Sequence, residues 1–282
     1  MKSMIRVTDC TLIRTILLLS AALPLQLYSR QGTTDCHINA PRNGTYVVAH
    51  RGAHIGIPEN SLAAYQKAID LGCDYVEIDV RTTKDGKFVS IHNSNVDEYV
   101  TGVKGKVSEL NFVELRSLDI GLNTGPEWKG TKIPAFEEIL DLCKGKTGIY
   151  LDLKAADVSR LVDVIKRYNM EKDIIWYISA SDTYDIEELK KSCPDCILMP
   201  DPGSQDNIKT IVSKFNPCIL ATDMDKLGEK FVNTAHQCNT LVISDENEGT
   251  ETEWRQMLEW KTDGIQTDNP EKLISFLKSR KH

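Results

Sequence analysis

Apolar and polar residues follow two different periods along the chain from residue 46 onward. Short runs such as residues 47–49 are continuously apolar or alternate with polar side chains, which is typical of strands. Between such runs, apolar residues recur at helical spacing, as at Leu62, Tyr65 and Ile69 before the stop at Gly72. Repeated strand-then-helix order predicts an α/β protein built on a parallel sheet.

Nine segments have the pattern of a strand, whereas a (β/α)8 barrel has eight. One of the nine is therefore expected to be an accessory strand, and the pattern leaves open which one. The strand segments are residues 47–49, 75–80, 88–93, 148–154, 174–179, 197–199, 219–222, 241–244 and 264–267. The helical segments are the one that starts after residues 58–61, and residues 135–143, 156–168, 186–192, 207–214, 228–238, 253–260 and 270–277. Residues 94–131 show no clear strand–helix pair, and a segment of that length within a compact domain is usually functional.

Acidic and basic side chains lie near the carboxyl ends of two of these strands. Glu77 and Asp79 share one face of their strand, because successive side chains alternate between faces. Asp152 and Lys154 share a face of another strand in the same way. The carboxyl ends of parallel strands are where α/β proteins, and (β/α)8 barrels in particular, build their sites. These four side chains are therefore expected to line one mouth.

Two histidines and an arginine are expected at the same mouth. His50 and Arg51 end the first strand, and His92 ends the third, read as one more parallel strand. Carboxylates suit a hard divalent cation, basic side chains suit a phosphate, and histidine transfers protons near neutral pH. A single Glu-x-Asp or a lone histidine is more often structural, but the agreement of four strands favours metal-assisted phosphate ester chemistry.

The same residues belong to an ordered series of motifs that resembles the glycerophosphodiester phosphodiesterases. The resemblance runs from about residue 46 to residue 277, which is nearly the whole chain after its first segment. Its motifs are His50-Arg51-Gly52, Pro58-Glu59-Asn60-Ser61, Glu77-Ile78-Asp79-Val80, Thr83-Lys84-Asp85-Gly86, Val89-Ser90-Ile91-His92, Gly105-Lys106-Val107, Leu115-Arg116-Ser117-Leu118-Asp119-Ile120-Gly121, Ile133-Pro134-Ala135-Phe136, Leu151-Asp152-Leu153-Lys154 and Gly264-Ile265-Gln266-Thr267-Asp268-Asn269-Pro270.

The resemblance implies a TIM-type (β/α)8 barrel with a short insertion after the third strand, over the mouth of the active site. It also implies metal-dependent hydrolysis of a small-molecule glycerophosphodiester to glycerol phosphate and an alcohol. The family pattern carries Glu77 and Asp79 as metal ligands directly, and we add Asp152 as a third ligand to one divalent cation, Ca2+ or Mg2+. His50 and His92 are hypothesised to be the acid–base pair.

The remaining hypotheses concern the phosphate and the groups behind the site. Arg51 and Lys154 are expected to offset charge on the phosphoryl oxygens. Glu59 or Asn60 is expected to orient these groups from outside the reacting centre, although plain helix capping by Asn60 is equally consistent with the sequence.

Four positions depart from the family pattern. Asp152 stands where a glutamate is usual, Asn93 replaces an aspartate after the second histidine, and Glu98 stands near an expected arginine. Residues 241–245 lack a tryptophan that is common there. Phosphodiesterase chemistry is thus better supported than glycerol as the substrate moiety. A phosphodiesterase or phospholipase D-like enzyme acting on lysophospholipids or other phosphodiesters, and a non-catalytic phosphate-binding protein, stay open as alternatives.

Charge and the first segment restrict the partners and the location. A net charge of -7 and a pI near 5.5 argue against nucleic acid or an anionic membrane surface as a partner. Residues 1–29 have the basic–apolar–small order of a secretory signal peptide, and their apolar run is too short to span a membrane. Residues 30–45 are expected to be a linker and residues 46–282 the barrel domain. We therefore expect export to the periplasm or the medium, with no stable membrane insertion after cleavage.

The cysteines weakly oppose a fold built on disulfides. Cys193 and Cys196 form a single CxxC, which has no matching second pair for zinc and could form a local disulfide in an oxidising compartment. Cys73, Cys143 and Cys218 lie among apolar residues and are expected to be buried thiols.

Overall fold

The computed structural model describes residues 38–245 and 249–280. The expected signal peptide, residues 1–29, and the first part of the expected linker lie outside these residues. The described part of that linker contacts the barrel: the Arg42 amide donates to Asp74 Oδ1 at 2.9 Å, and the Arg42 guanidinium donates to the carbonyl of Lys146 at 2.6 Å. Within the described residues, no helix is both long enough and apolar enough to cross a membrane.

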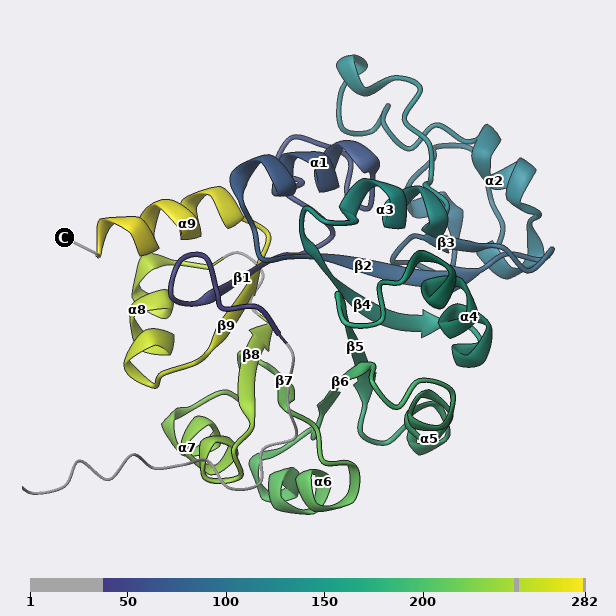
Figure 1. The fold of residues 1–282 in the computed structure, drawn as a ribbon. Helices are drawn as coiled ribbons and strands as arrows, with labels where there is room; N and C mark the ends of the chain where they lie inside the picture. Colours follow the sequence, from purple (N-terminus) through teal and green to yellow (C-terminus); the bar gives the residue numbers. More distant parts are fainter. Residues whose placement is uncertain (1–37, 246–248, 281–282) are drawn as a thin grey trace, which may run out of the picture. The chain divides into compact units, whose positions relative to one another are not determined.

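Eight parallel strands of the described residues form a nearly closed barrel (Figure 1), which confirms the predicted TIM-type fold. Their hydrogen-bonded order is β6-β5-β4-β2-β1-β9-β8-β7, and β6 lies beside β7 at the seam. Pro200 in β6 has no N–H to donate, which suits a strand at such a seam. The strands are β1 (Tyr46–Ala49), β2 (Tyr75–Thr82), β4 (Gly148–Ala155), β5 (Ile174–Ser179), β6 (Ile197–Asp201), β7 (Ile219–Asp223), β8 (Leu241–Asp245) and β9 (Gly264–Thr267).

The accessory strand is β3 (Phe88–Ser90), which pairs antiparallel with β2 in the register Val80 to Ser90. The reading of this strand as one more parallel strand is therefore wrong. The connection from β2 to β3 is a short turn at Gly86, where φ is 77°, and a parallel crossover needs a dozen residues or more. His92 consequently reaches the mouth at the end of a hairpin that folds back over β2.

Helices surround the ring of strands (Figure 1), and every predicted helix is present with its ends shifted by a few residues. The first begins where the Ser61 hydroxyl accepts from the Ala64 amide and ends at Gly72, where φ is 80°. The helices outside the insertion are α1 (Leu62–Leu71), α3 (Phe136–Cys143), α4 (Val158–Tyr168), α5 (Thr183–Ser192), α6 (Ile208–Phe215), α7 (Glu229–Gln237), α8 (Glu251–Glu259) and α9 (Pro270–Ser279), with a short 3-10 turn, η4 (Gln205–Asn207), before α6.

Strand alternation divides the core into two layers. Val76 and Ile78 of β2 belong to the large cluster between strands and helices. Tyr75 of the same strand belongs to the smaller cluster that fills the inside of the barrel. Glu77 and Asp79 follow Tyr75 at every second position, so they face the inside as well, at the carboxyl end.

The predicted insertion after the third strand is present and has a small core of its own, which includes Val96, Val107 and Leu115. It contains a helix that the sequence pattern did not single out, α2 (Phe112–Ser117), and three 3-10 turns, η1 (Val96–Glu98), η2 (Val107–Glu109) and η3 (Pro126–Trp128). Trp128 Nε1 donates to the carbonyl of Gly56 at 2.8 Å, which ties the insertion to the loop between β1 and α1.

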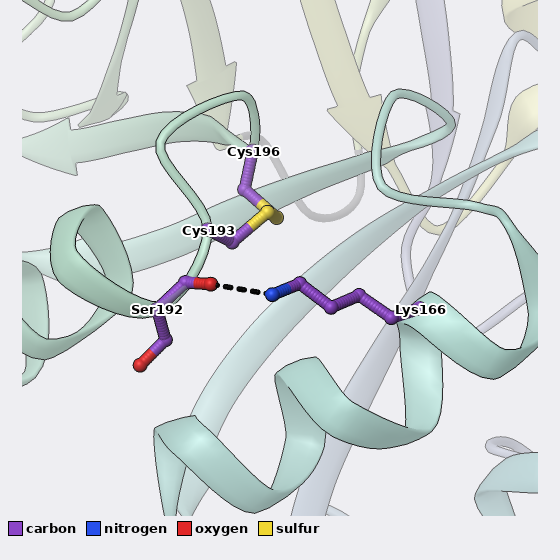
Figure 2. The surroundings of a disulfide bond; sticks show 4 residues. All are labelled: Lys166, Ser192, Cys193 and Cys196. Carbon is purple, nitrogen blue, oxygen red and sulfur yellow. Dashed lines mark hydrogen bonds between the residues drawn. A yellow bond between two sulfur atoms is a disulfide. The ribbon is translucent and has the colours of Figure 1, made fainter.

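Cys193 and Cys196 form the predicted local disulfide, directly after α5 (Figure 2). Beside it, Lys166 of α4 donates to the carbonyl of Ser192 at 2.7 Å. Cys73 and Cys143 are buried thiols, as expected. The expectation of a thiol at Cys218 is wrong, because that residue is disulfide-bonded. Its apolar neighbours, on which the expectation rested, indicate burial and carry no information about pairing.

The turn between β1 and α1 depends on Gly52. Its φ is 83°, and a Cβ added there would lie 2.7 Å from the backbone of Ala64 in α1. Gly56 in the same loop has a φ of 74° but no atom within 4 Å of an added Cβ. We expect Gly52→Ala to lower the free energy of unfolding by about 2 kcal/mol or more, since strain and a backbone clash add. The matched change Gly56→Ala should cost only about 1 kcal/mol. Urea denaturation of the two variants measures this, and equal losses would contradict the role of the close contact.

Candidate active site

Three carboxylates meet at the carboxyl end of the barrel. Glu77 and Asp79 come from β2 and Asp152 from the neighbouring β4, where Asp79 and Asp152 are paired in register. One oxygen from each lies within 4.8 Å of the others. Glu77 and Asp79 are only 2% and 1% exposed, so the cluster is closed on the protein side. The predicted convergence of the two strands is confirmed.

Asn60 and the Arg51 backbone hold two of these carboxylates in place. Asn60 Nδ2 donates to Asp79 Oδ2 at 2.8 Å, and the Arg51 amide donates to Glu77 Oε2 at 2.6 Å. Arg51 and Asn60 both have positive φ, at 52° and 51°, which turns the loop after β1 toward β2. The alternative that Asn60 caps the helix is wrong, because Ser61 is the N-cap.

The carbonyl of the Asn60 side chain is held in turn by two hydroxyl groups. Tyr65 of α1 donates to Asn60 Oδ1 at 2.8 Å, and Ser90 of β3 donates to the same oxygen at 2.8 Å. These contacts fix which end of the amide faces Asp79, and they join α1, β2 and β3 behind the site.

Both cationic side chains of the site are paired with carboxylates. Lys154 Nζ lies 2.7 Å from Asp152 and 3.4 Å from Asp79. The Arg51 guanidinium donates to both oxygens of Glu59, at 3.0 and 3.1 Å, and its Nε lies 3.7 Å from Asp79. That Nε is buried and has no hydrogen-bond partner among the described residues. Glu59 therefore orients Arg51, which is one of the roles predicted for it.

The electrostatics of the cluster fit a bound cation. Burial, and next the charges of Asp79 and Asp152, raise the pKa of Glu77 well above its usual value. Burial raises the pKa of Asp152 to about 6, against the lowering effect of Lys154. With Glu59 included, four carboxylates face two cationic side chains, so the fully ionised cluster carries two formal negative charges. Oxygen donors with excess negative charge are the set that a hard divalent ion prefers.

His50 is fixed by a carboxylate from the last strand. Its Nδ1 donates to Oδ1 of Asp268 at 2.6 Å. Asp268 directly follows β9, the strand that pairs with β1. This contact leaves Nε2 of His50 as the atom that can act on a substrate. His54 Nδ1 donates to the carbonyl of His50 at 2.8 Å, and its Nε2 lies 3.7 Å from Asp268. The sequence singled out neither Asp268 nor His54 as a site residue.

His92 is fixed by an amide and by its own backbone. Its Nδ1 donates to Asn93 Oδ1 at 2.6 Å, and the other end of that amide donates to Glu98. Arg81 of β2 holds the carbonyl of His92 from Nε at 2.9 Å. Burial is the largest cause of a lowered pKa of His92. The ring is therefore favoured in its neutral form, with Nε2 free to accept a proton.

Two of the departures from the family pattern thus touch each other, because Asn93 contacts Glu98. Both line a cavity of about 320 Å³ that opens beside Arg51, under the insertion. The other residues around this cavity are Pro58, Glu59, Tyr99, Ile120, Asn123 and Thr124. The walls are therefore mostly polar, which is relevant to the identity of the substrate.

Several residues that the sequence did not single out as site residues contact the site, some of them from distant parts of the chain. Asp268 is 218 positions from its partner His50, and Tyr65 reaches Asn60 across the first turn of α1. Asp245, at the end of β8, accepts from Gln266 of β9 at 2.8 Å. One signal in the sequence could have pointed to Asp245. Like Asp79, it is an acidic residue at an inward-facing position near the carboxyl end of a strand, and Asp201 and Asp223 have the same placement.

Comparison with solved structures agrees with the fold. The phosphodiesterase of Oleispira antarctica, solved in complex with the product sn-glycerol-3-phosphate, superposes with a TM-score of 0.76 at 22% identity over 83% of this chain and 96% of that one. A glycerophosphodiester phosphodiesterase from Agrobacterium tumefaciens gives a TM-score of 0.73 at 24% identity, over 82% and 99% of the two chains. At these identities the likeness establishes the barrel.

Sequence comparison establishes the family. A glycerophosphodiester phosphodiesterase of Caldanaerobacter subterraneus subsp. tengcongensis is 36% identical over 157 residues, so the match spans 53% of this chain and 63% of that protein. A glycerophosphodiester phosphodiesterase of Bacillus altitudinis is 26% identical over 84% of this chain and 100% of its own length. The model of the glycerophosphoryl diester phosphodiesterase family matches residues 50–227, more than half of the chain. The chain therefore belongs to the glycerophosphoryl diester phosphodiesterase family.

Proposed function

We propose that this protein hydrolyses glycerophosphodiesters to glycerol phosphate and an alcohol. The observation that carries the proposal is the meeting of Glu77, Asp79 and Asp152 within 4.8 Å, beside Arg51 and Lys154. Excess carboxylate charge suits a divalent cation, and neighbouring cationic groups suit a phosphodiester. The names of the sequence relatives support the same reaction class.

Glu77, Asp79 and Asp152 would hold one divalent cation, either Ca2+ or Mg2+. When bound, such an ion stabilises negative charge on a phosphoryl oxygen and helps to orient the substrate. Arg51 and Lys154 would bind other phosphoryl oxygens from the two sides of the carboxylate cluster. Asn60 and Glu59 would keep Asp79 and Arg51 in position.

The two histidines would move the protons of the reaction. His92, with Nε2 unprotonated, takes a proton from water as the water oxygen forms its bond to phosphorus. His50 gives a proton from Nε2 to the oxygen of the departing alcohol as the phosphorus–oxygen bond breaks. His50 carries a proton on each ring nitrogen when it acts as the acid; Asp268 accepts the Nδ1 hydrogen bond, orients the ring and offsets its positive charge. A poor alkoxide leaving group needs such an acid.

The cavity under the insertion favours a small polar alcohol over a lysophospholipid. An acyl chain needs an apolar surface, whereas most residues around this cavity are polar; Pro58, Tyr99 and Ile120 are the exceptions. A lysophospholipid substrate is nevertheless a second candidate, since a human relative named lysophospholipase D GDPD1 is 30% identical over 50% of this chain and 46% of its own length.

We further propose that the protein is exported. The basic–apolar–small order of residues 1–29 supports this location. The disulfide between Cys193 and Cys196 supports it as well, because disulfides persist in oxidising compartments.

Alcohol release from a panel of glycerophosphodiesters tests the proposed function. We expect turnover with Ca2+ or Mg2+, loss of turnover after thorough chelation, and recovery when the ion is returned. The panel should include a lysophospholipid with the same headgroup, which we expect to be the poorer substrate. Full activity in the chelated protein would contradict the metal site. Absence of turnover on every diester, with the ion bound, would favour the binding-protein alternative.

A further inference from the structure

The cavity under the insertion has the size of a small substituent. Its volume of about 320 Å³ is at the lower end for ligand pockets, so it suits a small substituent rather than a drug-sized ligand. Arg51 forms part of its wall, and Arg51 is also the proposed phosphate ligand. A group that enters this cavity from the site is therefore one that is attached to the phosphate.

The ionisable groups of the cavity leave one carboxylate uncompensated. Glu59 is taken by the Arg51 guanidinium through two hydrogen bonds. Glu98 contacts only the neutral amide of Asn93, and no ion pair to Glu98 is found among the described residues. The cavity thus has a cationic group at one wall, where the phosphate would lie, and an anionic group at another.

We infer that this cavity binds the alcohol part of the diester and that Glu98 selects alcohols that carry a primary ammonium group. In such a diester, an anionic phosphate is followed by a cationic ammonium group. The cavity offers the complementary charges in the same order: cationic Arg51 would face the phosphate, and anionic Glu98 would face the ammonium group. A primary ammonium has three N–H donors for the Glu98 carboxylate and its polar surroundings, and Asn123 and Thr124 also line the cavity. The inference rests on the proposed function, since it concerns the leaving group of that reaction.

A second acidic region at the mouth offers a competing location. Asp201, Asp223 and Asp245 end β6, β7 and β8 at inward positions. Asp223 is already paired with Lys226, and Asp245 accepts from Gln266. The cavity beside Arg51 is therefore the better candidate for binding the ammonium group, and the experiment distinguishes it from the second acidic region.

The test compares two diesters that differ by one charge: glycerophosphoethanolamine and its neutral 2-hydroxyethyl analogue, each with saturating Ca2+. The readout is the ratio of kcat/KM for the charged diester to kcat/KM for the neutral one. Glu98 is exposed, so we expect Glu98→Gln to lower this ratio about threefold, the scale of an exposed ion pair. Glu98→Lys should lower the ratio further. Asp97→Asn removes the same charge one residue earlier, outside the cavity, and should leave the ratio unchanged.

The ratio is used because Glu98 also contacts Asn93, which holds His92. Any change in the position of His92 slows both substrates alike and cancels in the ratio. A ratio that is unchanged in both Glu98 variants would overturn the inference, as would a shift found only in Asp201→Asn. Failure of the wild-type protein to hydrolyse these two diesters and every other diester of the panel, with Ca2+ and with Mg2+, would overturn the proposed function and this inference together. Hydrolysis of both with an unshifted ratio would overturn this inference alone.

Discussion

Replacing either His50 or His92 with alanine is expected to lower kcat by about a hundredfold or more, the usual scale for a general acid or base. KM should change little, because the cation site, Arg51 and Lys154 would still bind the phosphate. The pH profile of kcat should be bell-shaped in the wild-type protein and lose one limb in each variant. His92 should account for the acidic limb, since burial lowers the pKa of its ring and favours the neutral base.

His236 provides the control for these variants. It pairs with Asp263 at 2.8 Å on α7, away from the carboxylate cluster. His236→Ala removes an imidazole and a carboxylate contact, as His50→Ala does, but should keep kcat near its original value. Steady-state kinetics of the three variants across pH settle the matter. A near-normal kcat in either His50→Ala or His92→Ala would show that the histidine is structural and that the two-histidine mechanism is wrong.

The second large effect is expected at Glu77, whose substitution should remove activity and cation binding together. Glu77→Gln should lower turnover by about a hundredfold or more, because the bound ion stabilises charge worth several kcal/mol in the transition state. The wild-type protein should melt at a higher temperature with Ca2+ or Mg2+, and Glu77→Gln should lose most of that increase. Glu259→Gln, an exposed change on α8, should leave both properties unaltered.

The same variant tests the electrostatics of the ion-free protein. A carboxyl group whose pKa is raised by folding contributes stability at low pH, and that contribution is lost as pH rises from the unfolded to the folded value. For Asp152 this interval runs from 3.8 to about 6, and Glu77 adds a loss in the same direction. With chelator at neutral pH, Glu77→Gln should therefore be at least as stable as the wild type. Melting temperatures across pH measure this, and a less stable variant would contradict an uncompensated cluster.

Some of this site follows from local sequence pattern. Strand side chains alternate strictly, so Glu77 and Asp79 had to share a face opposite Val76 and Ile78. Parallel strands place their carboxyl ends together, so Asp152 and Lys154 were expected at the same mouth. The ends of α1 were also predictable, because Ser61 and Gly72 cap the helix through contacts that span only a few residues.

The position of β3 was predicted correctly, but its direction was predicted wrongly. An apolar run reads alike whether it pairs parallel or antiparallel, and the short turn at Gly86 decides the direction. The same limit applies to Asn60. Its place before a helix suggested a cap, whereas a positive φ turns its amide toward Asp79.

The sequence by itself determined the barrel, the inward face of each strand and most of the residues that meet at the mouth, because these depend on backbone periods of two and 3.6 residues. Only the tertiary structure decided which partner fixes each functional group. Asp268 reaches His50 across 218 positions because β9 pairs with β1 when the barrel closes. The Ser90 hydroxyl reaches Asn60 across 30 positions because β3 pairs with β2 beside the loop that carries Asn60. Such contacts depend on how distant elements pack, so the spacing of residues within a single strand or helix does not predict them.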